Sequence, residues 1–451
     1  MKLNCAYSIK PRRATCNTAR VMTAFGIGPD GGENVIARDL ELDPAPGKIV
    51  LFQGPSGSGK SSLLRRSAAC VDGAVHIDDS PGGEAALVDS LGCEADEAMR
   101  LLSLCGLGDA HLMLRSPDEL SDGQRYRFAL ASCVAGGAGT IVADEWCAKL
   151  DRVTAKVISR NARRLADQRG LALLLATAHD DLADDLQPDV IVRCGSSGAV
   201  AEARLPERRP ISFLGELTIT EGAARDWRHF AAWHYRGGRL GPVRRVLLLR
   251  HGDEPVGICI FGYGPLASPA RRMFFGLGGK ITAAGAMRIN REIAAVTRLV
   301  IDPRYRGAGI AWRFLRRACE LTSWRWIELV SEMAGVVPFC QAAGFTRVDA
   351  GDAVASNRGG GPNRTCYGKS NWTEEGFRKY QQRVRFSRPA YFILDNDKGV
   401  RGSPDKKGGK QAGLGEGQPA FRGAGQGGVP APLSHCSKTA AGKANICFSM
   451  L

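Results

Sequence analysis

The chain has 451 residues, of which 44% are hydrophobic and 24% are charged, and this balance is typical of a globular protein long enough for two domains. It contains no run of about 20 uncharged apolar residues, and its first residues lack the apolar core of a signal peptide, so we expect a cytoplasmic protein with no membrane segment. The net charge of +15 favours an anionic partner, such as a nucleotide or a nucleic acid.

Composition divides the chain into three regions. Residues 1–205 alternate short apolar runs with helical patterns, which predicts an α/β domain. A proline- and arginine-rich segment at 204–210 reads as a linker to a second domain over 211–396. Residues 397–451 are rich in glycine and lysine and are predicted to be a disordered basic tail. None of the 14 cysteines forms a C-x-x-C pair, so the sequence predicts no zinc site.

A phosphate-binding loop follows the first strongly apolar run, at 49–52. Its pattern, G-x-x-x-x-G-K-S, lies between a predicted strand and a predicted helix, as a P-loop requires. Glycines let backbone amides face phosphates, the lysine reaches the β- and γ-phosphates, and the last serine can bind Mg²⁺. The predicted ATP-binding residues are Gly54, Pro55, Ser56, Gly57, Ser58, Gly59, Lys60, Ser61 and Ser62.

Two acidic residues end a later apolar run at 140–143. Asp144 and Glu145 would lie at the carboxyl end of a buried strand beside the P-loop. An acid in the first position can hold Mg²⁺, and the next acid can orient or deprotonate the attacking water. We therefore assign Asp144, with Ser61, to Mg²⁺ and Glu145 to the water.

The segment Leu-Ser-Asp-Gly-Gln at 120–124 makes the pattern specific, because it resembles the L-S-G-G-Q signature of ABC ATPases. Leu150 and Asp151 resemble the D-loop of that family, and His179 resembles its switch histidine, which contacts the γ-phosphate. The resemblance covers about residues 20–200 and implies ATP hydrolysis by an ATP-dependent homodimer. In such a dimer Ser121, Gly123 and Gln124 face the nucleotide that the partner's P-loop holds.

Two features depart from the ABC pattern. No glutamine lies between Lys60 and Leu120, so the usual Q-loop residue is absent, and Asp89 is a weak substitute. This absence disfavours an ATP-binding subunit of a transporter, which stays as a third hypothesis. Trp146 follows Glu145 where proline is common, and the sequence gives no physical reason for it.

The second region contains strand-like runs at 245–250, 256–263, 294–301 and 327–330, and a glycine-rich turn follows the third. The order resembles the core of GNAT acyltransferases, a fold of the α+β class whose motif (Q/R)-x-x-G-x-(G/A) is matched by Arg306, Gly309 and Ala311. The resemblance implies that acetyl-CoA is bound by Val300, Ile301, Arg306, Gly307, Ala308, Gly309, Ile310 and Ala311.

The catalytic groups of this region are less defined by the sequence. Cys340 stands where many GNAT proteins have a tyrosine that protonates the departing thiolate. Glu292 and Glu332 are alternative general bases, and each can equally be a solvated acid at a strand end. Catalysis by proximity alone, with water carrying the protons, is also open.

Residues 230–237 combine aromatic side chains with a histidine and an arginine, and their His-Tyr pair resembles the phage Mom family of DNA modifiers. A packed amphipathic helix is the alternative interpretation. The whole folded chain resembles predicted ATPase–acetyltransferase fusions. The leading hypothesis is therefore an ABC-type ATPase coupled to an N-acyltransferase, and the second is a nucleic-acid-associated ATPase.

Overall fold

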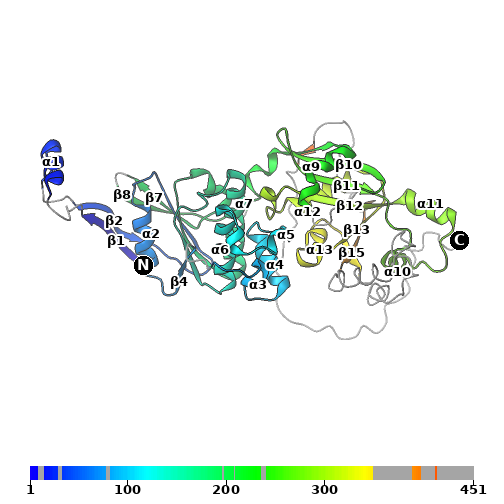
Figure 1. Cartoon of the computed structure of the whole chain (residues 1–451), viewed down its shortest axis with the longest axis horizontal. Helices are drawn as coiled ribbons and strands as arrows, with labels where there is room; N and C mark the ends of the chain where they lie inside the picture. Colours follow the sequence, from blue (N-terminus) through cyan, green and yellow to red (C-terminus); the bar gives the residue numbers. More distant parts are fainter. Residues whose placement is uncertain are drawn as a thin grey trace. The chain divides into compact units, whose positions relative to one another are not determined.

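The computed structural model describes residues 1–8, 15–28, 33–77, 82–195, 198–207, 209–234, 240–348, 389–397 and 412–413. Two compact units divide this chain (Figure 1): the first is Met1–Phe213 with Asp302–Ala308, and the second is Leu214–Ile301 with the described residues from Gly309 onward. Almost all of the predicted tail, 397–451, lies outside the described residues. Among the described helices, none has the length and hydropathy needed to cross a membrane.

The first unit contains a six-stranded sheet in which five neighbouring strands are parallel and the last is antiparallel. In spatial order the strands are β4 (Ala74–His76), β5 (Thr140–Ala143), β6 (Ala172–Thr177), β3 (Ile49–Gln53), β7 (Val190–Gly195) and β8 (Gly198–Ala203). Every residue of β3, β5 and β6 is buried, because continuous apolar runs suit strands that are covered on both faces.

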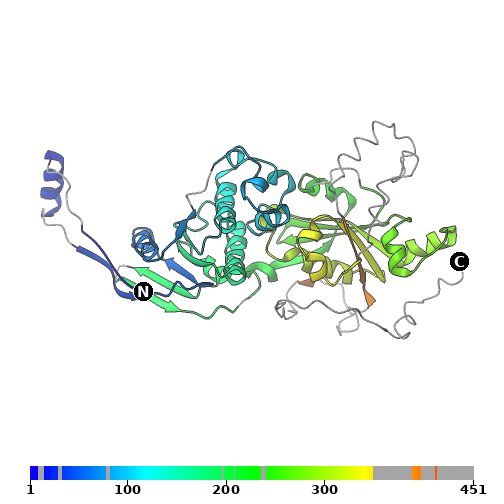
Figure 2. The same cartoon turned by 90° about the horizontal axis from the view of Figure 1, so that it is seen from below.

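Helices and an antiparallel pair of strands cover the two faces of this sheet. The helices of the unit are α1 (Cys16–Phe25), α2 (Lys60–Ala68), α3 (Leu87–Ser90), α4 (Ala95–Leu104), α5 (Ala110–Met113), α6 (Asp122–Ala135), α7 (Arg152–Arg169) and α8 (Ala183–Leu186). Alternate residues of β3 face opposite sides: Ile49 and Leu51 pack with α3 to α7, whereas Val50 and Phe52 pack with α2 and the antiparallel pair β1 (Lys2–Ser8) and β2 (Glu33–Glu41). Helix α1 buries no side chain and lies beyond the β1–β2 pair in both views (Figure 2).

The second unit contains an eight-stranded sheet. In spatial order its strands are β14 (Thr346–Val348), β15 (Ala390–Asp395), β13 (Trp326–Ser331), β12 (Ile293–Ile301), β11 (Glu254–Gly262), β10 (Val243–His251), β9 (Leu217–Glu221) and β16 (Ala412–Gly413). Only β12 and β13 are parallel neighbours in this described sheet. The four strands predicted from apolar runs are confirmed as β10, β11, β12 and β13.

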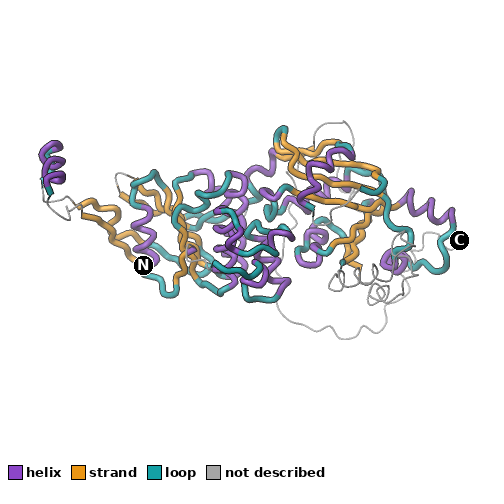
Figure 3. Tube along the Cα trace, viewed as in Figure 1, coloured by secondary structure: helices purple, strands orange, loops and turns teal. Residues whose placement is uncertain are grey.

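Short helices complete the second unit, and Figure 3 distinguishes the helices from the strands of each unit. They are α9 (Trp227–Phe230), α10 (Pro269–Phe275), α11 (Ala283–Glu292), α12 (Ile310–Glu320), α13 (Met333–Val336) and α14 (Phe339–Ala342). Single 3₁₀ turns in the two units are η2 (Pro117–Glu119), η3 (Asp180–Leu182), η4 (Ser212–Glu216), η5 (Ala224–Asp226), η6 (Ala231–Trp233) and η7 (Pro303–Tyr305).

Candidate functional site

The predicted P-loop joins the end of β3 to the first residue of α2. Its backbone turns back so tightly that a Cβ atom on Gly54 would lie 2.2 Å from the carbonyl oxygen of Cys194. Gly59 has φ of +90°, and a Cβ atom there would lie 2.6 Å from Cγ2 of Ile36. Since neither place admits a side chain without movement, the glycines set the shape of the loop.

Polar groups inside the loop are arranged to receive an anion. Lys60 Nζ donates to the carbonyl oxygens of Gly54, at 2.8 Å, and Pro55, at 2.7 Å, so its charge lies over the loop. Ser58 Oγ is buried and has no hydrogen-bond partner. No side chain caps α2 at its N-cap, Gly59, and the first-turn amides of a helix have no partner within the helix. A phosphate group would satisfy these groups together.

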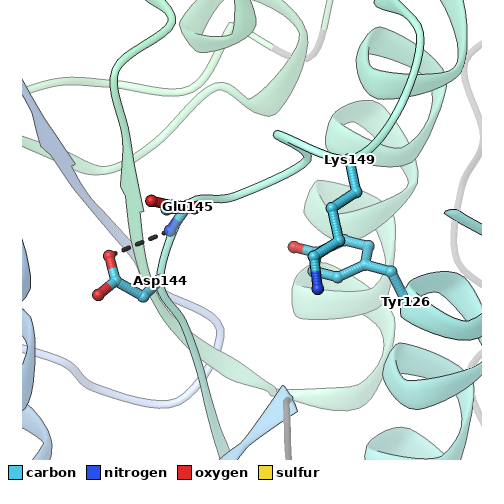
Figure 4. Close-up of a pocket in the computed structure, with 4 residues that line it drawn as sticks. All are labelled: Tyr126, Asp144, Glu145 and Lys149. Atoms are coloured by element: carbon cyan, nitrogen blue, oxygen red, sulfur yellow. Dashed lines mark hydrogen bonds between the residues drawn. The ribbon is translucent and has the colours of Figure 1, made fainter. Parts of the chain in front are cut away.

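The two acidic residues follow β5, which is separated from β3 in the sheet only by β6. A cavity of about 180 Å³ is lined by Tyr126, Asp144, Glu145 and Lys149. Figure 4 shows the two acids on one side of this cavity, with Tyr126 and Lys149 on the other. The backbone N–H of Glu145 donates to Asp144 Oδ1 at 3.1 Å, which orients the Asp144 carboxylate. Both acids therefore line the same cavity as Tyr126, which lies on the helix that begins with the signature segment.

The signature segment begins helix α6. Ser121 is the N-cap: its Oγ accepts from the N–H of Gln124 at 3.4 Å, and Gln124 Oε1 accepts from the N–H of Ser121 at 3.1 Å. This reciprocal pair is a capping box, which fixes the start of the helix. A Cβ atom on Gly123 would lie 3.1 Å from Cδ2 of Leu150, so the signature segment packs directly on the D-loop.

His179 follows β6 and is held through its backbone. Its N–H donates to Thr177 Oγ1 at 3.2 Å, and its carbonyl accepts from Gln53 Nε2 at 3.3 Å. Because β3, β5 and β6 are parallel, the P-loop, the two acids and His179 all leave the sheet at the carboxyl edge. The sequence did not single out Gln53, whose side chain joins the end of β3 to His179.

The chain is similar to known proteins over this unit. The taurine import ATP-binding protein TauB of Pseudomonas aeruginosa (strain UCBPP-PA14) is 32% identical over 220 residues, which is 42% of this chain and 82% of the relative. The chain belongs to the ABC ATPase family. This ABC ATPase is also 28% identical to the aliphatic sulfonates import ATP-binding protein SsuB 1 of Rhodococcus jostii (strain RHA1), over 41% of the chain and 83% of the relative.

Other comparisons are less informative. No family model matches the chain. A solved bacterial ABC transporter cassette, described as dimeric, is 20% identical with a TM-score of 0.32, covering 38% of this chain and 92% of that one.

The residues assigned to acyl-CoA binding are divided between elements. Val300 and Ile301 are buried near the end of β12, and Gly309 is the N-cap of α12. Arg306 and Gly307 belong to the first unit. There Arg306 Nη1 lies 3.4 Å from Asp109 Oδ2. Burial lowers the pKa of the Arg306 guanidinium, and the Asp109 carboxylate partly offsets this lowering.

The three acyltransferase candidates lie in different surroundings. Glu292 ends α11, and one of its oxygens accepts from Arg288 Nε at 3.0 Å. Glu332 precedes α13. Cys340 is fully buried in α14, and burial raises the pKa of its thiol, which holds the proton on sulfur.

The aromatic segment before β10 contributes to the core. Phe230, which ends α9, is buried with Trp227 in an apolar cluster with residues of β10, β11 and β12, and a 3₁₀ turn follows it at Ala231–Trp233. Of the His-Tyr pair that resembles the DNA modifiers, Tyr235 lies outside the described residues, as does Arg236.

Proposed function

We propose that the first unit binds ATP with Mg²⁺ and hydrolyses it. The observation that carries this proposal is the P-loop, in which a buried, unpartnered serine hydroxyl and the charge of Lys60 face the uncapped start of α2. The relatives at 28–32% identity are named as ATP-binding proteins, which supports the same ligand.

The proposed chemistry follows from the positions of the side chains. Lys60 and the amides of the loop bind the β- and γ-phosphates. Ser61 and Asp144 would hold Mg²⁺, which neutralises phosphate charge. Glu145 aligns a water and accepts its proton as the oxygen bonds to the γ-phosphorus and the bond to the β-phosphate oxygen breaks. His179 is proposed to contact the γ-phosphate from the end of β6.

A second copy of the chain is proposed to complete the site. Ser121, Gly123 and Gln124 lie at the start of α6 rather than on the loop that holds the phosphates. In an ATP-dependent homodimer they would contact the nucleotide of the partner. The fixed helix start supports this role, because the capping box presents the segment without further ordering.

We further propose that the second unit is a GNAT-like acyltransferase whose substrate is acetyl-CoA. Strands β12 and β13 pair from Ile293 to Val296 and from Trp326 to Leu329, yet β12 continues to Ile301 and β13 to Ser331. The two strands therefore do not pair with each other beyond Val296 and Leu329. Backbone groups at such an opening can bind the amides of an acyl-CoA arm, and α12 begins just beyond β12.

The names of the relatives favour one alternative, the ATP-binding subunit of an importer. A nucleic-acid-associated ATPase is the other alternative, favoured by the net charge of +15. Acyl transfer to cell extract, measured by mass with and without ATP, tests the coupled-enzyme proposal. Equal rates of acyl transfer with and without ATP would contradict the proposed coupling. No acyl transfer in either condition would contradict the proposed acyltransferase activity.

Phosphate release from the purified chain tests the ATPase directly. Glu145→Gln should lower kcat by at least about a hundredfold while ATP still binds, because the variant loses the proton acceptor. Lys60→Ala should weaken nucleotide binding itself. Glu202→Gln, an exposed acid on β8 paired with Arg193, is the matched control and should change neither quantity. Equal turnover in all four proteins would contradict the assignment.

A further inference from the structure

The backbone around Glu145 adopts a conformation that requires support. Glu145 has φ of +51° and Cys147 has φ of +59°, which are two of the four left-handed non-glycine residues in the described chain. Side chains with a Cβ atom rarely adopt this region, so surrounding contacts must hold them there. The residue between them is Trp146, which has no exposed surface at all.

Trp146 is held by contacts with three elements of the first unit. Its backbone N–H donates to the carbonyl of Ala176 on β6 at 2.6 Å. Its indole Nε1–H donates to Ser159 Oγ on α7 at 2.9 Å, within the core. Its ring lies edge-on to Tyr126 of α6, with ring centroids 6.0 Å apart. The backbone of Trp146 thus joins it to the strand before His179, and its side chain joins it to the helix after the D-loop and to the signature helix.

Tyr126 connects this anchor to the catalytic cavity. Its ring contacts Trp146, its hydroxyl accepts from the N–H of Cys147 at 3.2 Å, and it lines the same cavity as Glu145. Cys147 is therefore held by a side chain of α6, and Trp146, next to Glu145, is held by side chains of α6 and α7. A movement of α6 would therefore change the position of Glu145 through the contact between Tyr126 and Trp146.

We propose that Trp146 is a positioning residue for ATP hydrolysis, which sets the direction of Glu145 by clamping the left-handed turn through Ser159 and Tyr126. This inference rests on the proposed ATPase function. It also accounts for a tryptophan where the family commonly has proline: a proline would have no N–H for Ala176 and no donor for Ser159.

The test uses the full chain with two single variants, their double variant and one control. Trp146→Phe keeps an aromatic ring but loses the indole donor, and Ser159→Ala keeps the indole but leaves it without an acceptor. Each should lower kcat about tenfold or more, because misplacement of a reacting group by about 1 Å can cost a hundredfold. The dissociation constant for ATP, measured with a fluorescent analogue, should change less than about twofold, since neither residue is on the P-loop.

The double variant Trp146→Phe/Ser159→Ala separates positioning from stability. Replacing both partners of a buried hydrogen bond leaves no unsatisfied polar group, so the double variant should lose less melting temperature than the sum of the two single losses. Its kcat should stay low, because the clamp is still missing. Leu165→Ala, a buried residue of the same helix α7, is the control that should lower the melting temperature and leave kcat unchanged.

Two results would overturn the inference and would differ from failure of the ATPase proposal. Full kcat in Trp146→Phe and Ser159→Ala, in a chain whose turnover depends on Glu145, would remove the positioning role alone. Recovery of kcat together with melting temperature in the double variant would show that only folding was affected. Absence of turnover in the unaltered chain would instead remove the ATPase proposal.

Discussion

A buried charge pair in the second unit gives a prediction whose size follows from the structure. Arg271 of α10 and Glu328 of β13 are 1% and 2% exposed. Arg271 Nε donates to one Glu328 oxygen at 2.9 Å, its Nη2 donates to the other, and the Tyr391 hydroxyl donates to Glu328 Oε2 at 2.7 Å. Burial lowers the pKa of Arg271, but its bonds to the Glu328 carboxylate raise the pKa by a larger amount. The pKa of Arg271 is therefore raised overall.

Glu328→Gln removes the negative charge and leaves the Arg271 guanidinium uncompensated in the core. Breaking one partner of a buried ion pair costs about 3–5 kcal/mol. A Cβ atom on Gly264 would lie 1.7 Å from Glu328 Oε1, so the carboxylate packs against this backbone with little room for water to replace it. We therefore expect the upper part of this range to apply.

Amide hydrogen exchange measures the loss of stability that Glu328→Gln causes within the second unit. At one tenfold change per 1.36 kcal/mol, a cost of about 4–5 kcal/mol should make the amides of β13 and β15 exchange roughly 900- to 4,700-fold faster in the variant. Amides of β3 and β6, in the first unit, provide the internal reference and should not change. Exchange in β13 as slow as in the unaltered chain would refute the reasoning.

A triple variant tests the physical cause. Arg271→Met, Glu328→Leu and Tyr391→Phe together remove both charges and the hydroxyl of the network. Replacing a whole buried ion pair by apolar residues is often neutral or stabilising. The triple variant should therefore exchange more slowly than Glu328→Gln, and faster exchange would show that packing rather than the uncompensated charge sets the cost.

Three further outcomes are expected. Asp189→Asn should lower the free energy of unfolding by about 1.5–3 kcal/mol at pH 7, since Asp189 accepts from the N–H of Ile49 and from Arg163. Burial raises the pKa of Asp189, but these bonds lower it by more, so its pKa in the folded chain lies below the unfolded value of about 3.9. In thermal unfolding, the stability difference between Asp189→Asn and the unaltered chain should therefore be complete above pH ~4. It should shrink as the pH falls through the lowered pKa. Gly54→Ala should abolish ATP binding, measured by calorimetry, because the added methyl would meet a backbone oxygen. Asp144→Asn should raise the Mg²⁺ concentration for half-maximal turnover by about tenfold or more.

Local patterns predicted the parts of the fold that depend on local physics. Buried parallel strands need continuous apolar runs, so β3 and β5 were visible in the sequence. The P-loop and the acids after β5 were also visible, because phosphate chemistry demands a fixed spacing of residue types.

Contacts between distant residues were not predictable in this way. Arg271 and Glu328 are 57 positions apart, and neither lies in a motif. Trp146 was noticed only as a departure from the family, because its meaning depends on Ser159, 13 positions later on the next helix. Cys340 was selected by its place in a motif, and in the structure it is completely buried.

Asp122 shows how a departure from a motif can be explained by its position in a helix. In the sequence it replaces a neutral glycine in a segment proposed to face a phosphate, where a carboxylate would repel. The structure places it at the first residue of α6, where a carboxylate typically gains about 0.3–1 kcal/mol from the helix dipole. The capping box of Ser121 and Gln124 fixes the same helix end through local bonds. Asp122 therefore stabilises the start of α6, whereas glycine would leave it more flexible, and the substitution is compatible with the chemistry proposed for its neighbours.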